Sequence, residues 1–284
     1  MATAEQIQYH YDVDAAFFMS FLDSAYHVYS GAVWKSADTL EMAQVNKFSR
    51  LSSFAHVKPG DRVLDIGCGW GGMLKYATDV VGACEAVGLT LSRDQHAFIA
   101  ARDNPRIKAH LCSWNDFASL DVFDTVVSIG AFEHFASRQD RIAGCHIDVY
   151  RAFFKKCALL THNDSYIGLQ TIVTSRAPVS RQELQDARYL LDHVFPGSAL
   201  PTINDIRAAI LDLYEVRELR TIGSDYVRTL EAWIQRLKNN EDFIITRYGL
   251  ELFQHYHRYF EAARRNFEFG VTDLIQVSLH RLPT

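Results

Sequence analysis

Three closely spaced glycines, Gly67, Gly69 and Gly71, follow an apolar segment at residues 62–66 that carries one acid, Asp65. Glycine lets the backbone turn tightly and lie against a ligand, because no Cβ stands in the way. Glycine-rich turns between a strand and a helix also bind nicotinamide or flavin cofactors, and some are only structural turns. Here the order is D-x-G-x-G-x-G rather than G-x-G-x-x-G. The sequence therefore predicts a ligand-binding loop at Gly67 and Gly69.

Polar and aromatic residues follow three further segments that read as strands, at 85–90, 107–111 and 123–129. In a doubly wound sheet the ligand lies across the carboxyl ends of the strands, so these residues should share one edge. Hydroxyl and amide groups there can bind a ribose, an indole can cover an adenine, and a carboxylate can face a sulfonium. The candidates are Thr90, Leu91, Gln95, Trp114, Asn115, Phe132, Glu133 and His134.

The order of strand-like and helix-like segments defines the expected architecture. Their alternation predicts an α/β fold with a doubly wound, mostly parallel sheet. The remaining strands are expected at 166–173, 214–222 and 274–280, with a long helical region at 226–268. We divide this single catalytic domain into an N-terminal helical cap (1–55), a core with the glycine loop (56–175), and a helical lid with the last two strands (176–284).

The composition is that of an ordinary globular protein. Its 284 residues are 48% hydrophobic and 22% charged, with a formal net charge of −5. That charge gives no attraction to nucleic acid, and no basic recognition stripe is present. The five cysteines form no C-x-x-C pair and the 12 histidines lack zinc spacing, so we expect neither disulfides nor a metal site. No apolar run approaches the roughly 18 residues of a membrane span, and we expect a cytoplasmic protein.

Together these motifs resemble the S-adenosylmethionine (SAM) site of Rossmann-like class I methyltransferases, and in particular the cyclopropane-fatty-acid-synthase-like family. That family includes mycolic acid cyclopropane synthases and plant alkaloid N-methyltransferases. The resemblance runs nearly end to end, from His10-Tyr-Asp12 to Tyr226-Val-Arg-Thr-Leu230, and Cys68-Gly-Trp-Gly71 and Phe132-Glu-His134 are typical of this family. It implies that SAM is the cofactor. The implied SAM contacts are Tyr29, Ser30, Gly67, Gly69, Thr90, Leu91, Gln95 and Trp114, to which position adds Asp65 and Asn115.

The resemblance also implies a bound bicarbonate that collects a proton from the substrate. By position this anion would contact Glu133, Tyr226 and Ile172, together with a cysteine and a histidine. Here Gly31 replaces the cysteine and Gln170 replaces the histidine, and a glutamine cannot take up a proton. We therefore predict poor bicarbonate binding, with the proton removed by Glu133 or Tyr226. We also expect Gly31 to free volume for a bulkier substrate.

The resulting hypothesis is a SAM-dependent methyltransferase for a small hydrophobic or lipid-like acceptor in a natural-product or lipid pathway, acting by C-methylation at an olefinic carbon. Methyl transfer to a double bond leaves a carbocation, which needs aromatic faces, a negative group and a base. Glu133 and Tyr226 are the candidates for base or charge stabiliser, with His134 second. The substrate-pocket candidates are Gly31, Phe132, Gln170, Ile172 and Trp233.

Three alternatives stay open at this point. N-methylation of a small amine needs only a proton acceptor, which Glu133 and His134 could supply. A cyclopropane fatty acid synthase comes next, although the chain lacks the basic amphipathic surface expected of an enzyme that contacts bilayer phospholipids. The third is a SAM-binding protein without catalysis. The aromatic stretch at 243–260 is interpreted as a moving lid or as the interface of a homo-oligomer.

Overall fold

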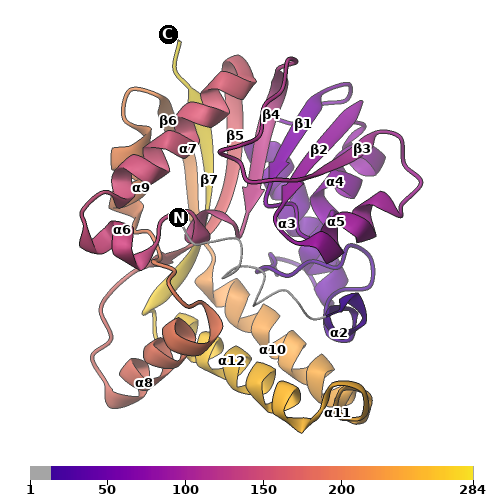
Figure 1. Cartoon of the computed structure of the whole chain (residues 1–284), viewed down its shortest axis with the longest axis vertical. Helices are drawn as coiled ribbons and strands as arrows, with labels where there is room; N and C mark the ends of the chain where they lie inside the picture. The colour runs from indigo at the N-terminus through magenta and orange to yellow at the C-terminus, as the bar shows by residue number, and fades with distance from the viewer. Residues whose placement is uncertain (1–13, 284) are drawn as a thin grey trace.

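The computed structural model describes residues 14–283, which contain one seven-stranded sheet. The strands are β1 (Arg62–Ile66), β2 (Glu85–Thr90), β3 (Ile107–Leu111), β4 (Phe123–Ile129), β5 (Thr161–Thr174), β6 (Tyr214–Thr221) and β7 (Thr272–Arg281). Their order is β3-β2-β1-β4-β5-β7-β6, and β7 alone among them runs antiparallel to both of its neighbours (Figure 1). The predicted mostly parallel sheet is confirmed. β5 begins at Thr161, before the start predicted at 166. The sequence did not reveal this earlier start, because residues 162–164 are polar and exposed and show no strand pattern.

Helices cover both faces of the sheet and its carboxyl edge. They are α2 (Ala15–Met19), α3 (Leu40–Phe54), α4 (Gly72–Tyr76), α5 (Arg93–Ala100), α6 (Arg138–Ile142), α7 (His146–Leu160), α8 (Arg181–Tyr189), α9 (Ile203–Ile210), α10 (Gly223–Asn239), α11 (Glu241–Tyr248) and α12 (Leu250–Glu268). Short irregular turns add η1 (Ala77–Val81), η2 (Phe132–His134) and η3 (Leu190–Val194). Figure 1 shows α8, α10, α11 and α12 together below the sheet, where they form the lid.

The long helical region expected at 226–268 is three helices. α10 ends at the Asn240 cap, and Gly249 separates α11 from α12 with a φ of 91°, a value that helical residues do not adopt. The sequence Ser180-Arg-Gln-Glu183 has the form of a capping box, and the structure has this box at the N-terminus of α8, with Ser180 as the N-cap. At Ser92 only half of that motif forms. Its hydroxyl accepts the Gln95 amide, but the Gln95 side chain turns instead towards Thr90.

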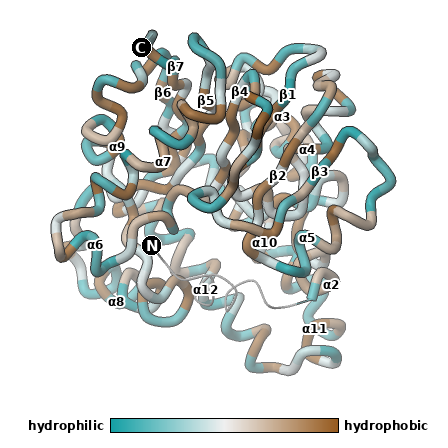
Figure 2. Tube along the Cα trace, turned by 45° about the horizontal axis from the view of Figure 1, so that its top comes forward, coloured by the Kyte–Doolittle hydropathy of each residue, from teal (hydrophilic) through white to brown (hydrophobic). Residues whose placement is uncertain are grey.

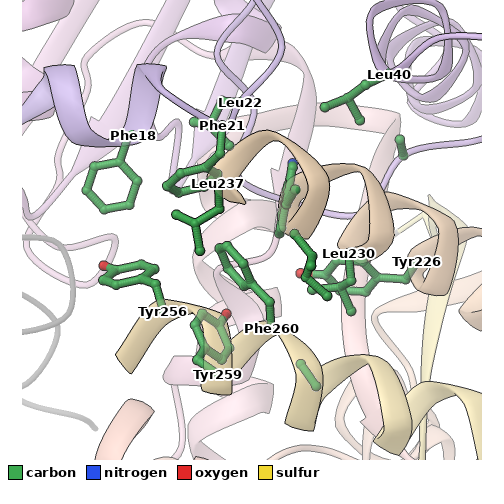
Figure 3. Packing of buried hydrophobic residues seen from close by; sticks show 14 of the residues in the cluster. Phe18, Phe21, Leu22, Leu40, Tyr226, Leu230, Leu237, Tyr256, Tyr259 and Phe260 are labelled. Atoms are coloured by element: carbon green, nitrogen blue, oxygen red, sulfur yellow. The ribbon is translucent and has the colours of Figure 1, made fainter. Parts of the chain in front are cut away.

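An aromatic cluster joins the N-terminal segment to the lid. Phe21 packs on Phe260 with ring centroids 5.2 Å apart, and Phe17 packs on Tyr256 at 4.5 Å (Figure 3). Most aromatic side chains of residues 243–260 are therefore buried within the protein. Phe243 is the aromatic side chain of this stretch that stays substantially exposed, at 43%. The rings of Tyr248, Tyr256 and Phe260 therefore pack against residues 17–21.

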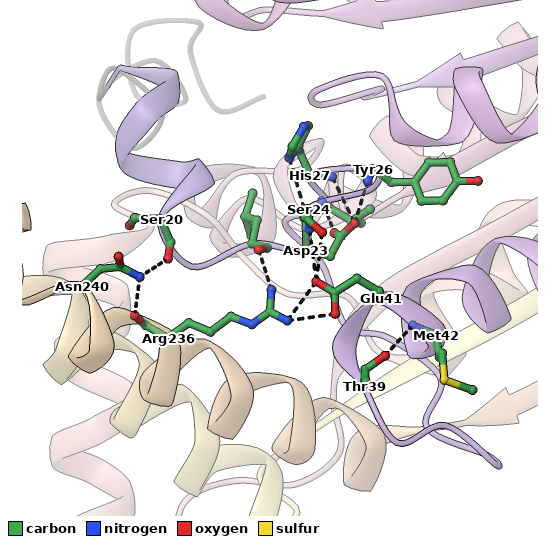
Figure 4. Close-up of polar contacts among 12 residues, drawn as sticks. Ser20, Asp23, Ser24, Tyr26, His27, Thr39, Glu41, Met42, Arg236 and Asn240 are labelled. Atoms are coloured by element: carbon green, nitrogen blue, oxygen red, sulfur yellow. Dashed lines mark hydrogen bonds and ion pairs between the residues drawn. The ribbon is translucent and has the colours of Figure 1, made fainter.

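Polar contacts hold the same two segments together. Arg236 of α10 donates from Nη1 to the carbonyl of Leu22 at 2.7 Å, and its Nη2 lies 2.9 Å from both carboxylate oxygens of Glu41 (Figure 4). One turn further on, the side chain of Asn240 donates to the carbonyl of Ser20 at 2.8 Å. Hydrogen bonds between charged groups are stronger than those between neutral ones. The lid is thus anchored to the segment that precedes the cofactor loop.

The sheet is apolar in its middle and polar outside. Figure 2 shows hydrophobic colouring along the central strands, and the side chains of Val126, Val127, Ile167 and Leu169 are completely buried. Such continuous apolar runs are expected of strands covered on both faces. Among the described residues, no helix combines the length and the apolar character that crossing a bilayer requires.

The glycine loop leaves β1 with three left-handed residues. At Gly67, where φ is +85°, an added Cβ would lie 2.3 Å from the Cβ of Ala131, so the packing of the protein itself excludes a side chain. At Gly69, where φ is +53°, an added Cβ would meet no protein atom within 4 Å. The two glycines therefore have different roles, since Gly67 allows close packing and Gly69 keeps space open.

We predict that this difference separates ligand binding from stability. Gly69→Ala places a methyl group in open space and should weaken binding of S-adenosylhomocysteine by roughly 10-fold or more, while the left-handed backbone lowers the melting temperature by only a few degrees. Gly67→Ala overpacks against Ala131 and should lower the free energy of unfolding by about 1–3 kcal/mol. Calorimetric titration and thermal melts measure the two effects. Unchanged affinity in Gly69→Ala would show that this glycine does not face the cofactor.

Candidate active site

The first cavity opens at the carboxyl ends of β1, β2 and β4 and occupies about 1130 Å³ including its mouth. Nine predicted cofactor residues line it: Tyr29, Ser30, Asp65, Gly67, Gly69, Thr90, Leu91, Gln95 and Trp114. The tenth does not. Asn115 is exposed and lies outside the cavity wall, and its backbone carbonyl accepts a hydrogen bond from Lys156 Nζ. Ser113, two residues earlier, lines the cavity instead. The turn that follows β3 points Asn115 outward, which the sequence alone did not indicate.

Hydrogen bonds orient the polar groups of this wall. The hydroxyl of Thr90 donates to Gln95 Oε1 at 2.7 Å, so the amide nitrogen of Gln95 is the end left for a ligand. The indole nitrogen of Trp114 is buried and has no hydrogen-bond partner among residues 14–283. Hydroxyl, amide and indole groups around an otherwise apolar cavity fit a nucleoside with a polar tail.

Asp65 supplies the charge of the first cavity. Its Oδ1 is buried and has no hydrogen-bond partner among the described residues. Burial raises the pKa of Asp65 to about 7, and the nearby Lys47 ammonium opposes that rise. An unpartnered carboxylate is costly to bury, so it fits a ligand that brings its own positive group. The amino group of the SAM methionine moiety is such a group.

A second, larger cavity lies between the sheet and the lid and occupies about 1870 Å³ including its mouth. Its wall is mostly apolar and comes from β5, α8, η3, α12 and β7. Four residues line both cavities, and they mark the place where the two meet: Tyr29, Ser30, Gly130 and His134. A group transferred from a ligand in the first cavity to one in the second would pass this junction.

Glu133 lies in the wall of the second cavity and is 4% exposed. Its Oε1 accepts the backbone amide of Ile172 at 2.9 Å, whereas Oε2 is buried with no hydrogen-bond partner in the part of the chain that the structure describes. Burial raises the pKa of Glu133 to about 7, although the bond from Ile172 and the nearby Thr171 hydroxyl act in the opposite direction. A carboxyl group with this pKa and one free oxygen can take up a proton near neutral pH.

Two other catalytic candidates also face the second cavity. Tyr226 lines it and packs on Phe267 with ring centroids 4.6 Å apart. His134 lies 3.3 Å from the hydroxyl of Ser198, and burial lowers the pKa of the histidine to about 4. His134 is therefore neutral at pH 7 and a weaker base than Glu133.

Gly31 and Gln170 lie where we expected them, but Gly31 does not leave the free space that we expected. Both line the second cavity, but a Cβ on Gly31 would lie 2.4 Å from Leu274 Cδ2 and 2.9 Å from Tyr226 Cγ. The expectation that Gly31 frees volume for substrate is wrong, because Leu274 and Tyr226 fill the space. Gln170 is fully buried, donates to the carbonyl of Gly31 at 3.1 Å and accepts from Gln276 at 2.8 Å.

Two predicted pocket residues belong to the core instead. Phe132 is completely buried and stacks on Tyr150 with centroids 4.5 Å apart, outside both cavities. Trp233 is also completely buried and packs behind Tyr29 at 5.2 Å. Adjacent residues on a helical turn point in different directions, so Glu133 reaches the cavity while Phe132 points into the core. Ile172 lines the second cavity as expected.

Three arginines in the second cavity were not anticipated from the sequence. Arg141 pairs with Asp205 at 2.8 Å and Arg176 pairs with Glu183 at 3.0 Å. Arg138 is exposed at the rim and makes no ion pair in the described part of the chain. No motif marks them, because they come from separate segments that meet only in the fold.

The chain is similar to known proteins over nearly its whole length. The family described as mycolic acid cyclopropane synthetase matches residues 1–277. Cyclopropane mycolic acid synthase 2 of Mycobacterium tuberculosis is 33% identical, covering 97% of this chain and 94% of that protein. The S-adenosylmethionine-dependent methyltransferase UmaA of the same organism is 31% identical, covering 97% and 96%.

Solved structures show the same fold. The cyclopropane synthase MmaA2 from Mycobacterium tuberculosis superposes with a TM-score of 0.88 at 28% identity, covering 99% of both chains. Mycolic acid cyclopropane synthase CmaA1, solved with S-adenosylhomocysteine and CTAB, has a TM-score of 0.86 at 28% identity and covers 98% of both. Coclaurine N-methyltransferase, with a TM-score of 0.82 at 19% identity, shares the fold. The predictions of the family and of SAM as cofactor are confirmed, and the chain belongs to the mycolic acid cyclopropane synthetase family of SAM-dependent methyltransferases.

Proposed function

We propose that this enzyme methylates an olefinic carbon of a long apolar acceptor. The observation that carries the proposal is the Oε2 of Glu133, which no described residue hydrogen-bonds, in the wall of a largely apolar cavity. A Cβ added to Gly130, which lies at the junction of the two cavities, would be 4.0 Å from Glu133 Oε1 and 3.7 Å from the Cβ of Ser30. The carboxylate is thus close to the place where a methyl group would cross.

The chemistry follows from these positions. Bound SAM supplies a methyl group activated by its positive sulfur. The electron pair of the acceptor double bond forms the new carbon–carbon bond, the carbon–sulfur bond breaks with its pair left on sulfur, and a positive charge remains on the neighbouring carbon. The negative carboxylate of Glu133 and the ring of Tyr226 stabilise that charge. Glu133 then removes a proton and restores a neutral product.

The second cavity also supports a choice among acceptors. Its depth and apolar wall suit a hydrocarbon chain better than a compact amine. Arg138 lies at the rim with no ion pair to any described residue, and it favours a chain that ends in an anionic group such as a carboxylate or phosphate. One relative is named a cyclopropane mycolic acid synthase, and this agrees with a lipid-like acceptor. The N-methylation alternative has only fold-level similarity in its support.

Cyclopropane formation is the second candidate, favoured by the full-length similarity to cyclopropane synthases. The two reactions share every step until the proton leaves. Loss of the proton from the new methyl group closes a three-membered ring, whereas loss from a neighbouring chain carbon leaves a methyl-branched olefin. The product formed depends on which hydrogen faces the base.

We expect Glu133→Gln to lower kcat by roughly 10²-fold or more, the scale of a lost general base. The wild-type rate should rise with pH up to about 7 and then level off, because the base acts when deprotonated and burial raises its pKa to about 7. The variant should lose this dependence. Affinity for S-adenosylhomocysteine should change little, since the carbonyl oxygen of the new side chain still accepts the Ile172 amide. Methyl transfer from labelled SAM at pH 5.5 to 8.5 measures both effects.

Tyr226→Phe is the matched control for that experiment. The variant keeps the ring and removes only the hydroxyl, so the Glu133 assignment predicts a much smaller loss than in Glu133→Gln. If Tyr226→Phe removes activity and the pH dependence while Glu133→Gln retains both, then Tyr226 is the base.

We also predict that methyl transfer does not depend on bicarbonate. Gln170 already donates to Gly31 and accepts from Gln276 and cannot supply a positive charge, and Leu274 and Tyr226 fill the space where a Gly31 side chain would lie. A buried anion without hydrogen-bond partners is costly. Rates in degassed, bicarbonate-depleted buffer should equal those with added bicarbonate. Loss of activity on depletion, restored by bicarbonate, would show that the anion still binds.

The role of Arg138 can be tested by changing only the charged end of a ligand. Oleate and oleamide share a chain and a double bond but differ in charge. We expect Arg138→Gln to weaken oleate binding by roughly 10-fold, as for a lost charge-assisted hydrogen bond, and oleamide binding by less than about 2-fold. Equal effects on the two ligands would refute the anionic-end assignment and leave the methyltransferase proposal untouched.

A further inference from the structure

Lys47 is a completely buried lysine that lines neither cavity. It lies in the middle of α3, and its Nζ donates to Ser30 Oγ at 2.8 Å. One turn earlier on the same helix, Gln44 Nε2 donates to the carbonyl of Ser30 at 3.0 Å. The helix therefore holds one residue of the cavity junction by both its backbone and its side chain. Fully buried lysines are rare and need a specific reason.

The direction of the Lys47 bond determines what Ser30 can do. Lys47 Nζ donates in this bond, so Ser30 Oγ acts as the acceptor. The single hydroxyl hydrogen of Ser30 is then left to donate elsewhere, and Ser30 lines both cavities where they meet. Lys47 thus converts a serine that could accept or donate into one that presents a donor to the junction.

The charges around Lys47 indicate which ligand group that donor meets. Burial lowers the pKa of Lys47 to about 7, and the carboxylates of Asp23 and Asp65 act in the opposite direction. Asp23 is engaged locally, because its oxygens accept the backbone amides of Tyr26, His27 and Val28. Asp65 lines the first cavity, and its Oδ1 has no partner among the described residues. Ser30 and Asp65 therefore both line the first cavity, and the Lys47 amine lies behind Ser30, outside the wall.

A free amino acid group has the complementary pattern, with a carboxylate beside an ammonium. Asp65 attracts the ammonium and repels the carboxylate, and the Lys47 side does the opposite. We propose that Lys47 is a positioning residue that turns the Ser30 hydroxyl towards the methionine carboxylate of SAM and adds a favourable charge behind it. The role concerns cofactor binding, so it holds whatever acceptor the second cavity takes.

Two ligands that differ only in the carboxylate test this assignment. S-adenosylhomocysteine carries it, and decarboxylated S-adenosylhomocysteine keeps the adenosine, the sulfur and the amine. We expect Lys47→Met to weaken binding of the first by roughly 10-fold or more and of the second by less than about 2-fold, measured by calorimetric titration. A purely structural role would weaken both ligands equally. Equal weakening, or no weakening of either, would overturn the proposal.

Further variants keep the test valid if Lys47→Met folds poorly. Ser30→Ala removes the same donor with a minimal change and should discriminate between the two ligands in the same way. The double variant should lose little beyond Ser30→Ala, because Lys47 acts mainly through Ser30. Gln44→Met is the matched control on the same helix. It removes the bond to the Ser30 backbone and should leave the ratio of the two affinities unchanged. Failure of Ser30→Ala to discriminate would also overturn the proposal.

Discussion

The site depends on how the irregular segment at residues 30–32 is held in place. This segment is buried, belongs to no strand and separates the two cavities. Buried backbone groups must find hydrogen-bond partners, and here side chains provide them. The carbonyl of Ser30 accepts Gln44, the carbonyl of Gly31 accepts Gln170, and the amide of Ala32 donates to Thr229 at 3.0 Å. Elements α3, β5 and α10 each supply one partner, so the cap, the sheet and the lid meet at this segment.

This arrangement gives a structural reason for a glutamine at position 170. Arg50 donates to Gln276, Gln276 donates to Gln170, and Gln170 donates to Gly31, at 3.3, 2.8 and 3.1 Å. The chain of bonds runs in one direction, and Gln170 needs both an acceptor and a donor end to continue it. Gln170 therefore helps to hold Gly31 in place, and one of its two amide hydrogens is committed to that bond.

Local sequence patterns are most informative where each has a single physical meaning. The glycine loop, the first four strands and the Ser180 cap follow from such patterns, and the structure has them at the expected residues. Such patterns are weaker guides where the direction of a side chain decides. Phe132 and Glu133 are adjacent, yet only the carboxylate faces the cavity. Local sequence patterns cannot predict contacts between distant segments, such as those that Arg176 and Lys47 make, because tertiary packing decides which residues meet.

The sheet order has a consequence for how the protein is made. β7, the last strand along the chain, lies between β5 and β6 and is antiparallel to both. β6 therefore cannot join the sheet when it leaves the ribosome, since its neighbour has not yet been synthesised. The nascent chain can form β1 to β5 early, but the lid helices that precede β7 have no completed edge to rest on. Domains generally fold as units. Here the acceptor cavity closes only once β7 has been synthesised, so the edge of β5 stays uncovered until then.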